Sequence, residues 1–378
     1  MLNRLIAVSK KEIKQILRDK KMLGILLGFP AFLLIIFGYA VNFDVHHVKT
    51  VIYDKDNSIA SKNLIKETFN SEYFDIIGYI NKDSEIKYLL DEKIAQAVLI
   101  IPNNLERDIY KKNNPIKVQV LIDGVDGNTA QAIKNYFNSG IQTFNNKINI
   151  ELLNKAGIKT NQAVKYEPKY WFNPELKSSK FLIPGLIGLI LVITAIISVS
   201  LSLVREKERG TIEQINVSSI RIVELLVGKS LPYFVLALFN ALFVLVAGYV
   251  FFDVSVTGSY WLLLLSTVVF LMASLSIGIF ISVIAETQQL AFTMATFVSM
   301  LPSVILSGFI FPIDSMPYLV QLLTNITPVK FYIIALRGII LKGVGLSAFY
   351  MQLIYLMLFF VVFMSLSAIL NYRKNKIA

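Results

Sequence analysis

The apolar positions of the chain gather into long stretches that are separated by polar segments of very unequal length. A helix needs about 20 mainly apolar residues to cross roughly 30 Å of hydrocarbon. The stretches that reach this length are residues 22–43, 181–203, 231–252, 260–285, 290–311 and 346–372. The pattern therefore predicts an α-helical polytopic membrane protein with six transmembrane helices.

The polar segment between the first and second stretches, residues 44–180, has a different pattern. Short apolar runs alternate with amphipathic segments at helical spacing. The predicted strands are 48–53, 74–80, 95–101 and 116–122, and the predicted helices are 58–70, 84–93, 102–112 and 128–153. This alternation predicts a small α/β domain inserted between the first and second spans, followed by a linker that returns to the membrane.

Basic residues near both ends of the chain predict its orientation. Residues 1–21 place leucine and isoleucine at helical spacing, with lysine and arginine between them. Such a helix is expected to lie in the headgroup layer, as a cytoplasmic interfacial helix. Arg373, Lys374 and Lys376 close the chain. Because basic residues favour the cytoplasmic side, we expect both termini to be cytoplasmic and the 44–180 domain to be extracytoplasmic.

The remaining chain, residues 181–378, is predicted to form a five-helix transmembrane domain that contains one irregular segment. Residues 312–345 combine three prolines and several charges with two short apolar runs. Irregular backbone at membrane depth must be shielded by protein, so we expect an outer re-entrant hairpin of short helices. The candidates for an outer gate near this hairpin are Pro302, Gly308, Pro312 and Pro317. The alternative is that these residues only shape the hairpin.

Composition narrows the classes of function. Hydrophobic residues make up 55% of the chain and charged residues 17%, which no soluble core explains. The formal net charge of +11 fits cytoplasmic basic loops better than nucleic-acid binding. With no cysteine and only the adjacent His46 and His47, neither a metal site nor a cofactor is expected. No nucleophile–base pair indicates an enzyme, and the middles of the spans lack the ionisable groups of ion-coupled transporters.

The stretch 204–230 is strongly charged and lies between two long apolar stretches. Apolar residues recur in it at helical spacing, at Ile212, Ile215, Ile222, Leu225 and Leu226. This spacing predicts an amphipathic helix in a short cytoplasmic loop, on which a soluble partner acts. Residues 228–230 read GKS, the end of a phosphate-binding loop, but Val223 occupies the position of the motif's first glycine. ATP hydrolysis, if used, is therefore expected on a partner chain.

Two separated motifs carry a resemblance to a known family. Residues 205–214 read REKERGTIEQ and resemble the R-E-[KR]-E-x-G-T-[LI]-E-Q signature of ABC-2 type transporter permeases. Residues 307–312 read SGFIFP, and with Met316-Pro317, Pro328 and Arg337-Gly338 they resemble the outer hairpin of that family. The large domain after the first span resembles its drug-exporter branch, among the membrane subunits of bacterial exporters.

The resemblance implies that the loop carries a coupling helix which contacts a separate ATP-binding subunit. The residues it places near that contact are Arg205, Glu206, Glu208, Arg209, Gly210, Thr211, Glu213 and Glu224. Mixed charges suit such an interface because they set orientation and register. The alternative is that they only solvate a surface loop, and Glu286 at an inner turn is open to the same two interpretations.

The function implied is the permease subunit of an ATP-driven exporter in the bacterial inner membrane, which moves a hydrophobic or amphipathic substrate outward. The implied partners are two copies of an ATP-binding subunit, a second permease that is the same or similar, and the lipid bilayer. A periplasmic adaptor protein is a further candidate. The alternative function is a subunit that transports nothing and transmits force to its outer domain. Accumulation of cargo in inverted vesicles would distinguish the two.

Overall fold

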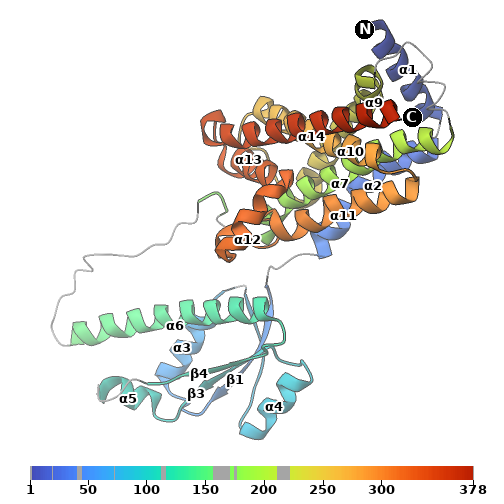
Figure 1. The fold of residues 1–378 in the computed structure, drawn as a ribbon. Helices are drawn as coiled ribbons and strands as arrows, with labels where there is room; N and C mark the ends of the chain where they lie inside the picture. The colour runs from blue at the N-terminus through green and yellow to red at the C-terminus, as the bar shows by residue number, and fades with distance from the viewer. Residues whose placement is uncertain are drawn as a thin grey trace. The chain divides into compact units, whose positions relative to one another are not determined.

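A computed structural model describes residues 2–18, 20–40, 45–71, 73–111, 116–155, 171–173, 177–210 and 222–377 (Figure 1). The chain divides into two units. One unit combines Met1–Asn42 with Tyr170–Ala378, and it holds the apolar helices. The other unit is Phe43–Lys169, and it holds the strands.

The unit Phe43–Lys169 is a four-stranded sheet with helices on both faces. The strands are β1 (Val48–Asp54), β2 (Phe74–Tyr79), β3 (Ala97–Ile101) and β4 (Gln119–Ile122), and the helices are α3 (Ile59–Phe69), α4 (Asp83–Asp91), α5 (Leu105–Lys111) and α6 (Gly127–Lys155). The strand order is β2-β1-β3-β4, in which β4 is antiparallel to β3 and the other pairs are parallel. Strands and helices follow the predicted order. The helix after β3 begins at Leu105 and not at Pro102 as predicted, because residues 102–104 form a turn.

Alternation along β3 explains why this sheet is covered on both faces. Leu99 belongs to a core cluster that α3 and α6 complete, whereas Val98 belongs to a second cluster that α4 completes. Successive strand residues point to opposite faces, and parallel strands buried on both faces read as continuous apolar runs. Phe137 of α6 anchors the larger cluster, with ring centroids 5.8 Å from Phe69 and 4.7 Å from Phe74.

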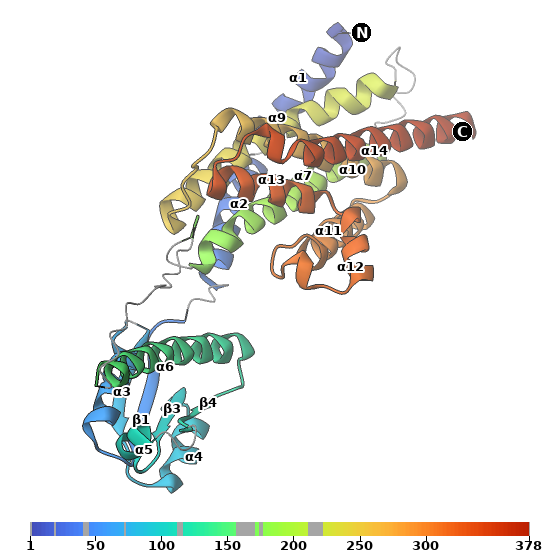
Figure 2. The ribbon, with the colours of Figure 1, turned by 90° about the vertical axis from the view of Figure 1, so that its left-hand side faces the viewer.

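The other unit is an assembly of helices. Its helices are α1 (Leu2–Arg18), α2 (Lys20–Ala40), α7 (Ser178–Glu208), α9 (Ile222–Phe252), α10 (Tyr260–Ile284), α11 (Gln288–Leu306), α12 (Tyr318–Leu323), α13 (Pro328–Lys342) and α14 (Tyr350–Ile377). Three 3-10 turns accompany them, Ile313–Ser315, Thr324–Ile326 and Leu346–Ala348. Figure 2 shows α12 and α13 as separate short helices.

Five helices in the described part of the chain are long and apolar enough to span a membrane, namely α7, α9, α10, α11 and α14. The α2 helix adds a shorter apolar stretch, Leu26–Ala40. The segments Tyr318–Ile326 and Pro328–Lys342 bend by 93° at their junction, and they form either one broken span or a re-entrant loop. The chain is therefore a polytopic helical membrane protein with five or six candidate spans.

Several predicted boundaries are wrong. Both ends of the charged stretch 204–230 are helical, because α7 continues to Glu208 and α9 already begins at Ile222; the predicted amphipathic helix falls mainly on residues 211–221, which lie outside the described residues. The fifth span ends at Leu306 and not at 311, since Gly308 adopts a left-handed φ of 76° that breaks the helix. The last span begins at Tyr350 and not at 346, after the turn Leu346–Ala348.

Burial separates central helices from peripheral ones. In the apolar windows of α7 and α10, 72% and 78% of the residues are buried, against 33% in α9, 22% in α11 and 11% in α14. The two central helices approach closely at Gly278, where an added Cβ would lie 2.8 Å from the carbonyl oxygen of Ile196. In a membrane the hydrophobic effect does not drive helices together, so their association depends on close packing. Small residues such as glycine permit that packing. The peripheral helices leave apolar faces for lipid or for another subunit.

Candidate functional site

The first element of the site is the N-terminal helix α1, one stripe of which packs against α9. Ser9, Glu12 and Ile16 recur at helical spacing, and all three are buried. The Ser9 hydroxyl donates a hydrogen bond of 2.7 Å to the carbonyl of Gly228. Gly228 lets the helices approach, because an added Cβ there would lie only 3.0 Å from the Cβ of Val8.

A second apolar stripe of α1 stays exposed within this chain. Ile6, Ile13 and Leu17 have relative exposures of 51%, 43% and 57%. The helix therefore offers one face to α9 and another to its surroundings. The location of α1 in the headgroup layer remains a prediction. Only this exposed stripe would contact the headgroups.

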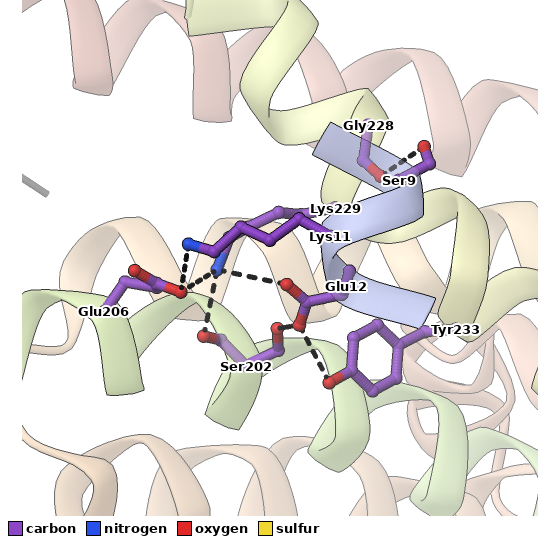
Figure 3. A network of polar contacts seen from close by, with 8 residues as sticks. All are labelled: Ser9, Lys11, Glu12, Ser202, Glu206, Gly228, Lys229 and Tyr233. Carbon is purple, nitrogen blue, oxygen red and sulfur yellow. Dashed lines mark hydrogen bonds and ion pairs between the residues drawn. The ribbon is translucent and has the colours of Figure 1, made fainter. Parts of the chain in front are cut away.

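A buried lysine joins three helices at this site (Figure 3). The Lys229 ammonium of α9 lies 3.6 Å from Oε2 of Glu12 on α1 and 3.3 Å from Oε1 of Glu206 on α7. The exposed fractions are 3% for Lys229, 3% for Glu12 and 8% for Glu206. Charges so far removed from water are tolerated only when they are paired and hydrogen-bonded.

Neighbouring groups complete the pairing. Oε1 of Glu12 accepts hydrogen bonds from the Ser202 hydroxyl at 2.6 Å and from the Tyr233 hydroxyl at 3.1 Å. The Lys11 ammonium, which is more than half exposed, lies 3.3 Å from Oε1 of Glu206. Two lysines thus face two glutamates, and only Lys11 reaches the outside of the group. We call Lys11, Glu12, Ser202, Glu206, Lys229 and Tyr233 the charge network.

The end of α7 also contacts the turn between α10 and α11. The Lys207 ammonium donates to the carbonyls of Val283 and Ala285, each at 3.1 Å, and to that of Ser282. A cation at this place satisfies carbonyls at the end of α10 and favours its dipole. Glu208 accepts a hydrogen bond of 2.6 Å from the backbone N–H of Gln288, the first residue of α11.

The structure separates the predicted coupling residues into three groups. Glu208, Arg209 and Gly210 are exposed where α7 ends, and Arg205 is half-buried. Glu206 and Glu224 are buried within this chain, and their place near the contact with an ATP-binding subunit remains a prediction. Glu206 pairs with Lys229, and Glu224 lies 4.0 Å from a guanidinium nitrogen of Arg4. Thr211 and Glu213 lie outside the described residues.

Sequence reasoning missed Glu12, Ser202, Lys229 and Tyr233. In the sequence Lys229 belongs to an incomplete phosphate-binding loop and fits the segment that resembles the family, whereas in the structure it is an ion-pair partner between helices. One signal was present in the sequence. Glu12 occupies the same helical stripe as Ser9 and Ile16, where a solvated charge is not expected.

The four candidate gate residues lie on the segment from α11 to α12. Pro302 is inside α11, Gly308 takes the left-handed turn after it, and Pro312 and Pro317 precede short helical turns. Arg337 of α13 holds this turn by donating to the carbonyls of Gly308 at 3.0 Å and Phe309 at 3.3 Å. These positions fit the interpretation that the residues shape the hairpin, and gating remains a prediction.

The described residues contain no group of three or more His, Cys, Asp or Glu that could hold a metal ion. The charge network itself consists of ion pairs and hydrogen bonds between helices. The network connects α1, α7 and α9, and the next residues of α7 contact α10 and α11. All of these contacts adjoin the loop that carries the sequence motif.

Comparison with known proteins gives the family. The profile of a family described as "ABC-2 family transporter protein" matches residues 20–369. The "Probable multidrug ABC transporter permease YbhS" of Escherichia coli K12 is 31% identical over 340 residues, which cover 90% of this chain and 89% of that protein. The similarly titled YbhR of the same organism is 29% identical over 347 residues, with 92% of each chain covered. Its "Inner membrane transport permease YhhJ" is 29% identical over 380 residues, covering 97% and 96%. The chain thus belongs to the ABC-2 family of transporter proteins.

Proposed function

We propose that this chain is the permease subunit of an ATP-driven exporter and that a separate ATP-binding subunit energises it. Three relatives that match nearly full length are titled as permeases, two of them as probable multidrug ABC transporter permeases. The substrate class we propose is hydrophobic or amphipathic, because the spanning helices present apolar surfaces. The chain itself hydrolyses no ATP in this proposal.

The observation that carries the proposal is the set of contacts around the end of α7. Glu206 ties α7 to α9 and α1, while Lys207 and Glu208 tie it to α10 and α11. A push on the loop between α7 and α9 would therefore reach five helices through direct contacts. An ATP-binding subunit can change the conformation of the permease only if it binds two conformational states of the permease with different affinities. The exposed residues Glu208, Arg209 and Gly210 are the described part of the proposed contact.

The proposed assembly contains two copies of the ATP-binding subunit and a second permease, the same or similar. The apolar faces of α9, α11 and α14, which are largely exposed in the single chain, suit a permease partner or lipid. We place the chain in the bacterial inner membrane, with both termini and the α7–α9 loop cytoplasmic. Helix α1 and the C-terminal ends of α7 and α14 lie toward the same end of the helical unit, which supports a common side of the membrane for them (Figures 1 and 2). The unit Phe43–Lys169 would then be extracytoplasmic, where a periplasmic adaptor is a candidate partner.

The test is a pair of charge reversals in the loop, Arg209→Glu and Glu213→Lys. If the loop contacts the ATP-binding subunit, each variant should insert and fold normally. The coupling of transport to ATP hydrolysis should fall about 5- to 150-fold, the usual range for one coupling free energy. Cargo-dependent ATPase activity in vesicles with the co-purified subunit provides the measurement. Lys14→Gln, which removes an exposed charge of α1, is the matched control. Wild-type coupling in both loop variants would refute the contact.

One observation favours a second function, the transmission of force to the Phe43–Lys169 unit without transport. That unit has its own folded core and is large enough to act on another protein. Inverted vesicles distinguish the two functions. An exporter accumulates cargo inside them at the expense of ATP, whereas a force-transmitting subunit hydrolyses ATP and accumulates none.

A further inference from the structure

A cavity of about 880 Å³ lies at the end of the helical unit opposite to the charge network. Its wall includes Phe181 at the start of α7, whereas Glu206 of the network is near the other end of the same helix. At 1.5 Å per residue these two positions are about 37 Å apart along α7. The volume is within the range of sites that hold small organic ligands, roughly 300–1,000 Å³.

One face of α13 supplies both the charge and the apolar surface of this cavity. Lys330, Arg337 and Leu341 follow one another at spacings of seven and four, which places them on the same side of the helix. Ile333 and Ile334 lie between them. This face of α13 therefore carries both cationic and branched aliphatic side chains.

The cations of the cavity have no carboxylate partner. Within the part of the chain that the structure describes, Lys330, Arg337 and Lys342 form no ion pair. Asp314 also lines the cavity, so three positive groups face a single negative one. A bound anion would complement this excess of positive charge.

Arg337 is held in place by the protein itself. Its guanidinium donates to the carbonyl of Phe181 at 2.9 Å and to that of Gly308 at 3.0 Å, and it stacks on the Phe181 ring at 3.8 Å. Lys330 donates to Thr324 and Asn325, each at 2.8 Å, which leaves one of its three N–H groups without an assigned acceptor. Lys342 is exposed at the end of α13. The cavity thus combines one fixed cation with two lysines that can still donate.

We propose that this cavity binds the phosphate-bearing head of an anionic amphiphile. Arg337 and Lys342 are about 8 Å apart along the helix, so the flexible lysine can reach a phosphate that lies beside the guanidinium. The apolar part of the ligand packs on Ile333, Ile334 and Leu341. Four of the five N–H groups of Arg337 donate to carbonyls, so the guanidinium offers the phosphate its positive charge and one remaining N–H, and a long lysine adds a charge-assisted hydrogen bond. This binding does not depend on whether the chain exports such a molecule.

Native mass spectrometry of the full chain, released from neutral detergent, tests the proposal. Phosphatidylglycerol should be retained as a single molecule per chain, in preference to phosphatidylcholine, whose head is zwitterionic. Lys342→Gln and Lys330→Gln should each weaken phosphatidylglycerol binding by about tenfold, the effect of losing one charge-assisted hydrogen bond. Lys87→Gln removes the same charge from an exposed site in α4 of the other unit and should change nothing.

Three results would overturn the proposal. Equal retention of the two lipids would exclude recognition of the anionic head. Wild-type affinity in both cavity variants, with folded protein by circular dichroism, would place the lipid elsewhere. Inorganic phosphate that displaces the lipid at equal concentration would show a simple anion site, without a contribution from the apolar wall.

Discussion

At the scale of single residues, the charge network is the least expected feature of this protein. Lys229, Glu12 and Glu206 are almost without contact with solvent, yet they come from three different helices. A buried ion pair contributes little net stability relative to apolar packing, but the loss of one partner is strongly destabilising. We infer that the network specifies where α1 docks more than it stabilises the fold.

Lys229→Gln should lower the stability of the folded chain by about 3–5 kcal/mol, because Glu12 and Glu206 would remain buried without their shared cation. Glu12→Gln should be milder, since Ser202 and Tyr233 can still hydrogen-bond to the amide. The double variant should be more stable than the sum of the single effects by about 0.5–3 kcal/mol, as expected for groups in contact. Unfolding of the detergent-solubilised chain in denaturant measures all three.

Lys14→Gln is the control for this cycle, because Lys14 lies on the same helix and is exposed. It should change stability by less than about 0.5 kcal/mol. Strictly additive effects of Lys229→Gln and Glu12→Gln would mean that the two side chains do not pair in solution.

At the scale of elements, the close approach of α1 to α9 depends on a glycine. Any side chain at residue 228 would meet Val8 and the carbonyl oxygen of Leu5, at 3.0 Å and 3.2 Å from its Cβ. The same glycine accepts the Ser9 hydrogen bond through its carbonyl. This contact joins the start of the chain to a helix more than two hundred residues later, directly beside the motif loop.

A disulfide between Val8→Cys and Gly228→Cys should form, because the two Cβ positions are close, the change at residue 8 removes the crowding γ-methyl groups of Val8, and the natural chain has no cysteine. The separation of 3.0 Å between these two positions needs only a small outward shift to reach the usual Cβ–Cβ distance of roughly 3.5–4.5 Å. Oxidation should yield a cross-linked chain, detected by peptide mass spectrometry. If α1 moves relative to α9 during the cycle, oxidation should also suppress ATPase coupling, and reduction should restore it.

The matched control pairs Leu17→Cys with Gly228→Cys, because Leu17 lies on the exposed stripe of α1. This pair should not cross-link. Efficient cross-linking of the control, or none in the Val8 pair, would contradict the docking of α1 described here.

At the scale of the whole molecule, the chain consists of two units with separate cores. Both core clusters of Phe43–Lys169 are built from residues of that unit alone. The helical unit is assembled from both sides of it in sequence, Met1–Asn42 and Tyr170–Ala378. A unit with its own core and paired strands is expected to fold without the rest of the chain.

Residues 43–169 expressed alone should therefore give a soluble α/β domain that unfolds cooperatively. Phe137→Ala should lower its free energy of unfolding by about 3–5 kcal/mol, because a buried aromatic ring would leave a cavity. Tyr79→Ala, at an exposed strand position, should change it far less. Circular dichroism during urea unfolding measures both, and a random-coil spectrum of the wild-type fragment would contradict independent folding.

The sidedness of the two units can be read from single cysteines in an otherwise cysteine-free chain. Lys87→Cys and Arg209→Cys are both exposed positions. A membrane-impermeant maleimide applied to intact cells with a permeabilised outer membrane should label Lys87→Cys directly. It should label Arg209→Cys only after the inner membrane is opened. Labelling of Arg209→Cys in intact cells would invert the orientation and exclude coupling to a cytoplasmic ATPase at this loop.

Periodicity predicted most elements because it is a local property of the chain. The strands and helices between β1 and α6 appear in their predicted order, and the predicted second to sixth spans each correspond to a helix. Their ends were less well predicted. Helix α7 runs past its apolar stretch to Glu208, since Glu206 and Lys207 find buried partners that no local pattern reveals.

The sequence by itself determined the class of protein, the order of its elements and its family, because hydrophobic spacing and a contiguous motif are both readable along the chain. Tertiary structure alone decided that Glu206 and Glu224 point into the protein, that Glu12 meets Lys229, and that α13 carries three cations into one cavity. These features join residues that are far apart in sequence; the hydrogen bond from Ser202 to Glu12 crosses 190 positions. Such pairs form only when the helices pack against one another, because the local sequence of either segment does not specify its distant partner.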